Sequence, residues 1–219
     1  IFGTELWAST GTAQGTQRLT DINPGNADSD PTHFTRVGNR LFFTADDGSS
    51  GRELYVTDGT PAGTRRVVDM FLGAGSALGT YAPHMTVAND LLYFRATSSA
   101  DPACRLFESD GSAVGTRCAY DAASIALGPV QGIQATANGA IVFTAWSAAD
   151  GEEPRVLFNR TLLNLTGADI APGPEGSAPQ SMKAVGNDVF FAADDGITGA
   201  ELWRLSLGDL ETLFSDGFE

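Results

Sequence analysis

The segment Glu53-Leu54-Tyr55-Val56-Thr57-Asp58-Gly59-Thr60-Pro61-Ala62-Gly63-Thr64 begins with five residues in which polar and apolar side chains alternate. Such alternation is typical of a β-strand. The next residues, Asp58-Gly59-Thr60, form a turn sequence, because glycine accepts positive φ and aspartate caps a turn with its own side chain. The segment therefore predicts a β-hairpin.

The first three residues of this hairpin recur along the chain at intervals of 46–52 residues. The other copies are Glu5-Leu6-Trp7, Arg105-Leu106-Phe107, Arg155-Val156-Leu157 and Glu201-Leu202-Trp203. An apolar block recurs four times with the same period, as Leu41-Phe42-Phe43, Leu92-Tyr93-Phe94, Ile141-Val142-Phe143 and Val189-Phe190-Phe191. Because these separate sequence landmarks share one period of about 50 residues, the chain consists of internal repeats.

Each period predicts four short strands, named A to D in chain order. Strand A includes residues 34–37 and ends in a turn at Gly38-Asn39, and strand B is the apolar block. Strand C starts at Glu-Leu-Tyr, and strand D covers residues 64–70. The contiguous apolar residues of strand B indicate a strand buried on both faces, which neighbouring units must cover. The sequence thus predicts an all-β, propeller-like array of four-stranded antiparallel blades, or a linear stack that does not close.

Strands C and D occur five times and strands A and B four times, which makes about four and a half repeats. The expected units of this single array over residues 1–219 are a half-blade at 1–25 and blades at 26–72, 73–123, 124–172 and 173–219. A half-blade leaves strand edges uncovered, and uncovered edges are templates for strand addition. We expect the chain to pair through residues 4–22, either with itself or with an upstream segment.

Charge and hydropathy exclude several partners. The chain has 13 Lys and Arg against 27 Asp and Glu, a net charge of −14. Nucleic acid and anionic membrane surfaces need clustered cations, so neither is expected as a partner. No stretch has the roughly 18 consecutive apolar residues of a membrane helix, so no membrane insertion is expected.

The segment 53–64 resembles the ELWxxDGTxxGT repeat family, and the flanking segments 21–25 and 41–48 resemble its linking sequences. The first, second and last copies carry the resemblance well, whereas the fourth has Asn159-Arg160-Thr161 in place of the Asp-Gly-Thr turn. The resemblance implies a large, bacterial, exported repeat protein at the cell surface or outside the cell. It supplies no catalytic residue.

Two acidic loops are candidates for metal binding. Asp46-Asp47 and Asp194-Asp195 lie between strands B and C, with Glu53 and Glu201 a few residues on. Ca²⁺ prefers six to eight oxygen ligands and could use such loops. Turn formation by Asp and Gly is the favoured interpretation, since the third and fourth copies lack the acidic pair. No cofactor is therefore assigned, with Ca²⁺ kept as the alternative.

No catalytic motif appears in the sequence. The two histidines, His33 and His84, precede strand A in successive repeats, where capping a loop is the favoured role. The aromatic residues at one repeat position are expected in the core between blades, or else as a sugar-binding ring: Trp7, Tyr55, Phe107 and Trp203. The expectation is a secreted or cell-surface structural and interaction protein that is not an enzyme, with a lectin-like or calcium-dependent binding module as the alternative.

Cys104 and Cys118 are the two cysteines, and both fall in the hairpin of the third copy. They replace the polar residues Arg52 and Arg66 of the second copy, at positions expected to be exposed. The turn between them brings strands C and D within cross-strand reach, which suits disulfide geometry. The sequence predicts a disulfide between them, in agreement with an oxidising compartment.

Overall fold

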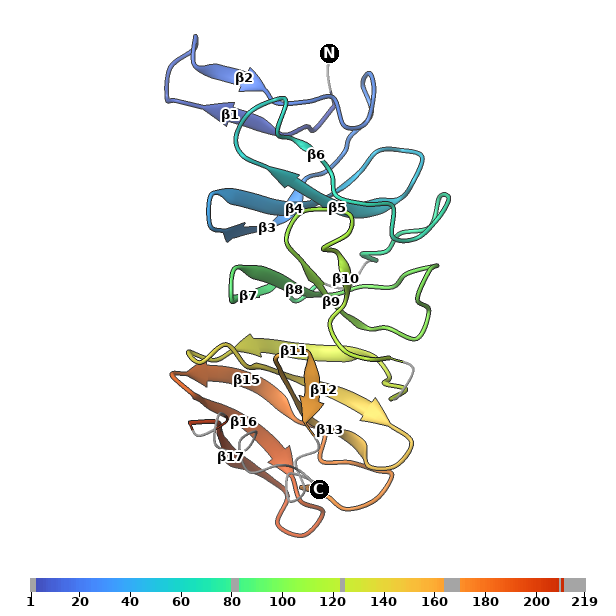
Figure 1. The fold of residues 1–219 in the computed structure, drawn as a ribbon, viewed down its shortest axis with the longest axis vertical. Coiled ribbons are helices and arrows are strands. Elements are labelled where there is room, and N and C mark those ends of the chain that lie inside the picture. Colours follow the sequence, from blue (N-terminus) through green and yellow to red (C-terminus); the bar gives the residue numbers. More distant parts are fainter. Residues whose placement is uncertain (1–2, 80–82, 123–124, 164–169, 209, 211–219) are drawn as a thin grey trace. The chain divides into compact units, whose positions relative to one another are not determined.

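The computed structural model describes residues 3–79, 83–122, 125–163, 170–208 and 210. Within these residues the regular elements are 17 β-strands, all paired antiparallel, and no helix is among them (Figure 1). Contacts divide the chain into two compact units, residues 1–119 and 120–219.

The first unit contains three sheets. A two-stranded hairpin is followed by two four-stranded sheets in which each strand pairs with the next along the chain. The strands are β1 (Trp7–Ser9) and β2 (Thr16–Arg18), then β3 (Thr32–Val37), β4 (Arg40–Asp46), β5 (Arg52–Thr57) and β6 (Arg65–Arg66), then β7 (Thr86–Ala88), β8 (Leu91–Arg95), β9 (Leu106–Ser109) and β10 (Arg117–Cys118).

The second unit contains a four-stranded and a three-stranded sheet with the same order. The strands are β11 (Val130–Ala135), β12 (Ile141–Ser147), β13 (Gly151–Phe158) and β14 (Thr161–Leu163), then β15 (Gln180–Val185), β16 (Asp188–Asp194) and β17 (Ala200–Ser206). The predicted D strand of this last sheet lies outside the described residues. The all-β class and the antiparallel sheets of up to four strands are thus confirmed.

The predicted double burial of strand B holds in three sheets. The apolar residues at the centres of β4, β8 and β12 are consecutively buried. In β16 burial alternates, so the described residues cover only one of its faces. Its covered face packs on the preceding sheet through Val142, Val156, Val189 and Phe191.

Sheet-to-sheet packing in the first unit starts at the hairpin β1–β2. Leu6, Leu19 and Ile22 pack against Phe43 and Tyr55 of the next sheet, and all five are buried. Because a two-stranded hairpin is marginal in water, this apolar contact is what holds β1–β2 in place.

The register corrects the sequence alignment of the fourth copy. Ala145 pairs with Glu153 in that sheet, just as Ala45 pairs with Glu53 in the second copy. Glu153 is therefore the counterpart of Glu53, and Arg155 stands where Tyr55 does. The sequence alone aligns Arg155-Val156-Leu157 with Glu53-Leu54-Tyr55. It does so because Pro154 and Arg155 interrupt the apolar pattern that would follow Glu153.

Candidate functional site

The hairpin β1–β2 has an open strand edge. The strands that correspond to β1 in the next three copies, β5, β9 and β13, each lie between two neighbours, whereas β1 pairs only with β2 within the described residues. The N–H of Leu19 donates to the C=O of Leu6, and the N–H of Thr10 donates to the C=O of Gly15. Because antiparallel hydrogen bonding alternates along a strand, the main-chain groups of Trp7 and Ser9 point away from β2.

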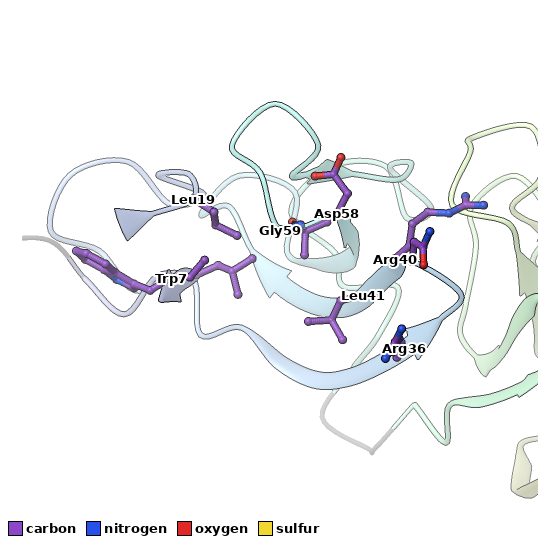
Figure 2. Close-up of a pocket in the computed structure, with 11 residues that line it drawn as sticks. Trp7, Leu19, Arg36, Arg40, Leu41, Asp58 and Gly59 are labelled. Atoms are coloured by element: carbon purple, nitrogen blue, oxygen red, sulfur yellow. The ribbon is translucent and has the colours of Figure 1, made fainter. Parts of the chain in front are cut away.

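A cavity of about 370 Å³ lies beside this edge, between the hairpin and the sheet β3–β6 (Figure 2). Its lining joins β1 and its flanks to the β3–β4 turn and the β5–β6 turn. The residues are Leu6, Trp7, Ala8, Leu19, Arg36, Asn39, Arg40, Leu41, Thr57, Asp58 and Gly59.

The cavity has an apolar floor and a charged rim. Leu19 and Leu41 point toward one another across it, while the indole of Trp7 is directed away (Figure 2). Arg36 and Asp58 are exposed on the rim. A concave apolar surface next to free main-chain donors and acceptors is suited to an added β-strand, whose backbone pairs and whose side chains fill the floor.

The aromatic residues at one repeat position do not form an exposed ring. Tyr55 and Phe107 are buried, as expected for side chains between sheets, whereas Trp7 is 50% exposed. Trp203 is partly buried and packs against the core of the second unit. Trp7 is exposed because it belongs to the two-stranded hairpin β1–β2.

The acidic loops cap their own turns. Asp46 Oδ1 accepts the Gly48 N–H, and Asp194 Oδ1 accepts the Gly196 N–H, at 2.8 and 2.7 Å. Asp195 Oδ1 accepts the N–H groups of Ile197 and Thr198. These Thr198 and Ile197 hydrogen bonds lower the pKa of Asp195. The carboxylates thus act as turn formers, as the favoured interpretation of the sequence had it.

Asp47 is shared between its turn and strand β6. Its Oδ1 accepts the N–H groups of Ser49 and Ser50, and its Oδ2 pairs with Arg66 at 3.0 Å. Burial alone would raise the pKa of Asp47, but the Ser50 and Ser49 hydrogen bonds and the Arg66 charge lower it.

Glu53, which the sequence placed beside these loops as an oxygen ligand, is fully buried. Its two carboxylate oxygens accept the N–H groups of Met70 and Ala77. Burial raises the pKa of Glu53 to about 7 against these hydrogen bonds. The sequence analysis did not predict that Glu53 binds backbone N–H groups inside the fold. The recurrence of Glu at this repeat position was the feature that could have indicated it.

The histidines lie where strand A begins, in left-handed backbone. His33 and His84 have φ of 56° and 46°, and Gly132 and Ser181 have φ of 60° and 57° at the same place in the next copies. The register of β3 shifts beside His33, so this position is a β-bulge. The His33 ring contacts the hydroxyl of Thr44, and burial lowers the pKa of the ring.

The structure joins Cys104 and Cys118 in a disulfide, with a Cα–Cα distance of 5.8 Å. Cys104 is fully buried, so the expectation of two exposed sites is wrong for it. Cys118 pairs with Phe107, and Cys104 lies three residues before Phe107, so the bridge runs diagonally across the hairpin. Asp101 lies near both sulfurs, but a disulfide offers no thiolate to a metal.

Comparison with known proteins gives structural likeness only. No protein-family model matches the chain, and no curated protein does. A puromycin hydrolase crystal structure is similar with a TM-score of 0.52 and 16% identity, over 88% of this chain and 29% of the hydrolase. A puromycin-hydrolyzing peptidase of Mycobacterium tuberculosis has a TM-score of 0.41 and 12% identity, over 95% of this chain and 41% of the peptidase. An endo-arabinase of Bacteroides thetaiotaomicron has a TM-score of 0.32 and 10% identity, over 89% of this chain and 80% of the arabinase.

These structures correct one expectation. The sequence was interpreted as that of a protein that is not an enzyme, but the puromycin hydrolase whose solved structure resembles it is an enzyme. The exclusion was wrong because it rested on short motifs, and a catalytic site can be assembled from distant residues. At 16% identity the likeness to the puromycin hydrolase shows the fold alone. This chain spans 29% of the length of that hydrolase. The described residues contain no helix with the length and apolar character needed to cross a membrane.

Proposed function

We propose that the chain is an extracellular repeat protein of the ELWxxDGT type, secreted or held at the cell surface, that self-associates through the open edge of β1. Its repeats serve as propeller-like blades that carry this edge. One observation carries the proposal: in the part of the chain that the structure describes, β1 pairs with β2 alone and borders an apolar cavity, while its counterparts β5, β9 and β13 are paired on both sides.

Two further features support the extracellular location and the blade interpretation. A disulfide persists in oxidising compartments and is rare in the cytosol. Four-stranded antiparallel sheets with a doubly buried second strand are the unit of a propeller blade, and a hydrolase structure shares the fold.

The test replaces the outward main-chain donor of Trp7. Trp7→Pro removes this N–H, which β2 does not use, whereas Trp7→Thr keeps the N–H and removes the same indole. Sedimentation equilibrium at rising concentration should show association of the wild-type chain and of Trp7→Thr, and monomers for Trp7→Pro. A wild-type chain that stays monomeric at all concentrations contradicts self-association, and equal behaviour of the two variants contradicts the role of the strand edge.

A further inference from the structure

The loop between β8 and β9 of the third copy contains a carboxylate that its turn does not use. Ser98 stands at the position of Asp47, because each lies four residues after the paired phenylalanines Phe94 and Phe43. The Ser98 hydroxyl accepts the N–H groups two and three residues on, as the Asp47 carboxylate does in the second copy. Within the described residues, no hydrogen bond or ion pair involves the carboxylate of Asp101, which is therefore available to a ligand.

This carboxylate lies beside the sulfur atoms of Cys104 and Cys118. One oxygen of Asp101 and the two Sγ atoms all lie within 4.8 Å of one another, and Cys104 is fully buried. A tetrahedral Zn²⁺ with Zn–S bonds of about 2.3 Å and a Zn–O bond of about 2.0 Å holds its ligand atoms about 3.5–3.8 Å apart. Once the sulfurs are no longer bonded to each other, side-chain rotation brings the three atoms to that spacing.

The same place in the second copy holds a cation. The strand register puts Cys118 at the position of Arg66, whose guanidinium lies 3.0 Å from a carboxylate oxygen of Asp47. The third copy keeps a carboxylate in this loop, Asp101, but has a sulfur where the positive charge stood. When both sulfurs are thiolates, a metal cation restores the charge balance between the loop and strand D.

Contacts other than the disulfide hold the three ligand residues in place. The guanidinium of Arg105 donates to the main-chain oxygen of Cys104 at 2.8 Å, and the N–H of Cys104 donates to the C=O of Asp101 at 3.2 Å. On strand β10, Arg117 pairs with the buried Glu108 at 2.9 Å, next to Cys118. Opening the disulfide therefore leaves the backbone around the ligands supported.

We propose that the reduced chain binds one Zn²⁺ through Cys104, Cys118 and Asp101, with water as the fourth ligand, so that metal and disulfide are alternative links between strands C and D. A dithiol reductant passes two electrons and two protons to the S–S bond, which breaks to give two thiols, while the reductant becomes a disulfide. Zn²⁺ then replaces the two thiol protons, which go to solvent. An oxidising disulfide and two protons reverse both steps, re-form the bridge and free the metal.

The donor set selects the metal. Two thiolates and one carboxylate suit a borderline-soft ion such as Zn²⁺, whereas Ca²⁺ and Mg²⁺ prefer oxygen ligands alone. Three protein ligands leave one position for water, as in zinc sites that are not purely structural. The site is independent of the proposed association through β1, because none of its ligands lies in the hairpin β1–β2.

The experiment uses the full chain, reduced with a dithiol and freed of it by gel filtration without oxygen. Titration with Co²⁺ should give the d–d bands of a four-coordinate site together with thiolate-to-Co²⁺ charge transfer, saturating at one ion per chain. Zn²⁺ should then displace Co²⁺ and abolish both signals. The oxidised chain should show neither signal, since its sulfurs are bonded to each other. Absence of thiolate charge transfer in the reduced chain overturns the site, as does the same spectrum in the oxidised chain.

Two variants with the same charge change test the carboxylate. Asp101→Asn should weaken Zn²⁺ binding to the reduced chain at least tenfold, measured by competition with a chromophoric chelator. Asp110→Asn is the matched control, because Asp110 lies in the same hairpin but accepts the Ser112 N–H within its own turn, and it should leave the affinity unchanged. Thermal unfolding of both oxidised variants shows that they fold. Equal Zn²⁺ affinity in the two variants overturns Asp101 as a ligand and with it the proposed site.

Discussion

The carboxylate of Glu53 accepts a hydrogen bond of 3.2 Å from the backbone N–H of Ala77, 24 residues along the chain. The same step joins Glu5 to the hydroxyl of Ser29 at 2.8 Å and Glu153 to the N–H of Ser177 at 2.7 Å. Each of these glutamates also accepts an N–H 17 residues on: Glu5 from Ile22, Glu53 from Met70 and Glu153 from Ile170. In the first, second and fourth copies one buried carboxylate thus fastens the connection from strand D to the next sheet.

Removing this fastening should destabilise the first unit. Glu53→Ala leaves the buried N–H groups of Met70 and Ala77 without an acceptor, and each unsatisfied group costs about 1–3 kcal/mol. The expected loss is about 3 kcal/mol in the free energy of unfolding, measured by urea denaturation. Glu201→Ala is the matched control, because Glu201 is exposed, and its effect should stay within about 0.5 kcal/mol. Equal losses in the two variants would remove the structural role assigned to Glu53.

Stability should also depend on pH through Glu53. Burial raises its pKa from 4.5 to about 7, so the folded chain holds this proton more tightly than the unfolded chain. The resulting stabilisation is fully present below pH 4.5 and is lost as pH rises through 7. The stability of the wild type relative to Glu53→Gln should therefore fall by about 2.5 kcal/mol between pH 5 and pH 8.

The measurement is urea unfolding of both proteins at the two pH values. The pKa values of His33 and His84 are lowered in the folded chain. Their titration therefore makes the free energy of unfolding rise with pH, which is opposite to the effect of Glu53. Both histidines are present in both proteins, so their effect cancels in the difference. A difference that does not change with pH would show that Glu53 keeps one protonation state throughout.

The repeat made most of the fold predictable from the sequence. Turn residues such as Asp58-Gly59 and contiguous apolar blocks such as residues 41–43 encode local geometry, so the order of strands followed from them. Contacts between residues 17 to 24 positions apart leave no such local pattern. The role of Glu53 was therefore missed, and the fourth copy was aligned on Arg155 rather than on Glu153.

The open edge was predictable and its cavity was not. Counting strands predicts a half-blade at residues 1–25, and among the described residues β1 pairs with β2 alone. The cavity depends on where the turn at Asp58-Gly59 lies against Leu19 and Trp7, which is a packing property of two copies. For the same reason the burial of Cys104 was missed, since its position in the sequence matches the partly exposed Arg52.

The third copy has a disulfide and no glutamate at the position of Glu53. Arg105 stands at the position of Glu53, and the bridge Cys104–Cys118 ties the start of strand C to strand D instead. The chain-entropy model gives about 3 kcal/mol for a closed loop of this size. Cys104→Ala/Cys118→Ala should therefore lower the free energy of unfolding by about 3 kcal/mol.

Thiol counting of the wild type in denaturant without reductant is the accompanying measurement. It should find no reactive thiol before reduction and two after it. Two reactive thiols before reduction would show that the bridge is absent.

Two glycines at equivalent places provide a comparison of the occupied joint with the open one. Gly59 and Gly111 have φ of 89° and 85°, so Gly→Ala introduces the same backbone strain at both. Gly111→Ala also forces a Cβ against Arg40 and Phe42, whereas Gly59→Ala meets no atom within 4 Å. Thermal unfolding should show that Gly111→Ala costs about 1 kcal/mol more than Gly59→Ala. Equal stability losses in the two variants would mean that the turns at Gly59 and Gly111 have similar surroundings.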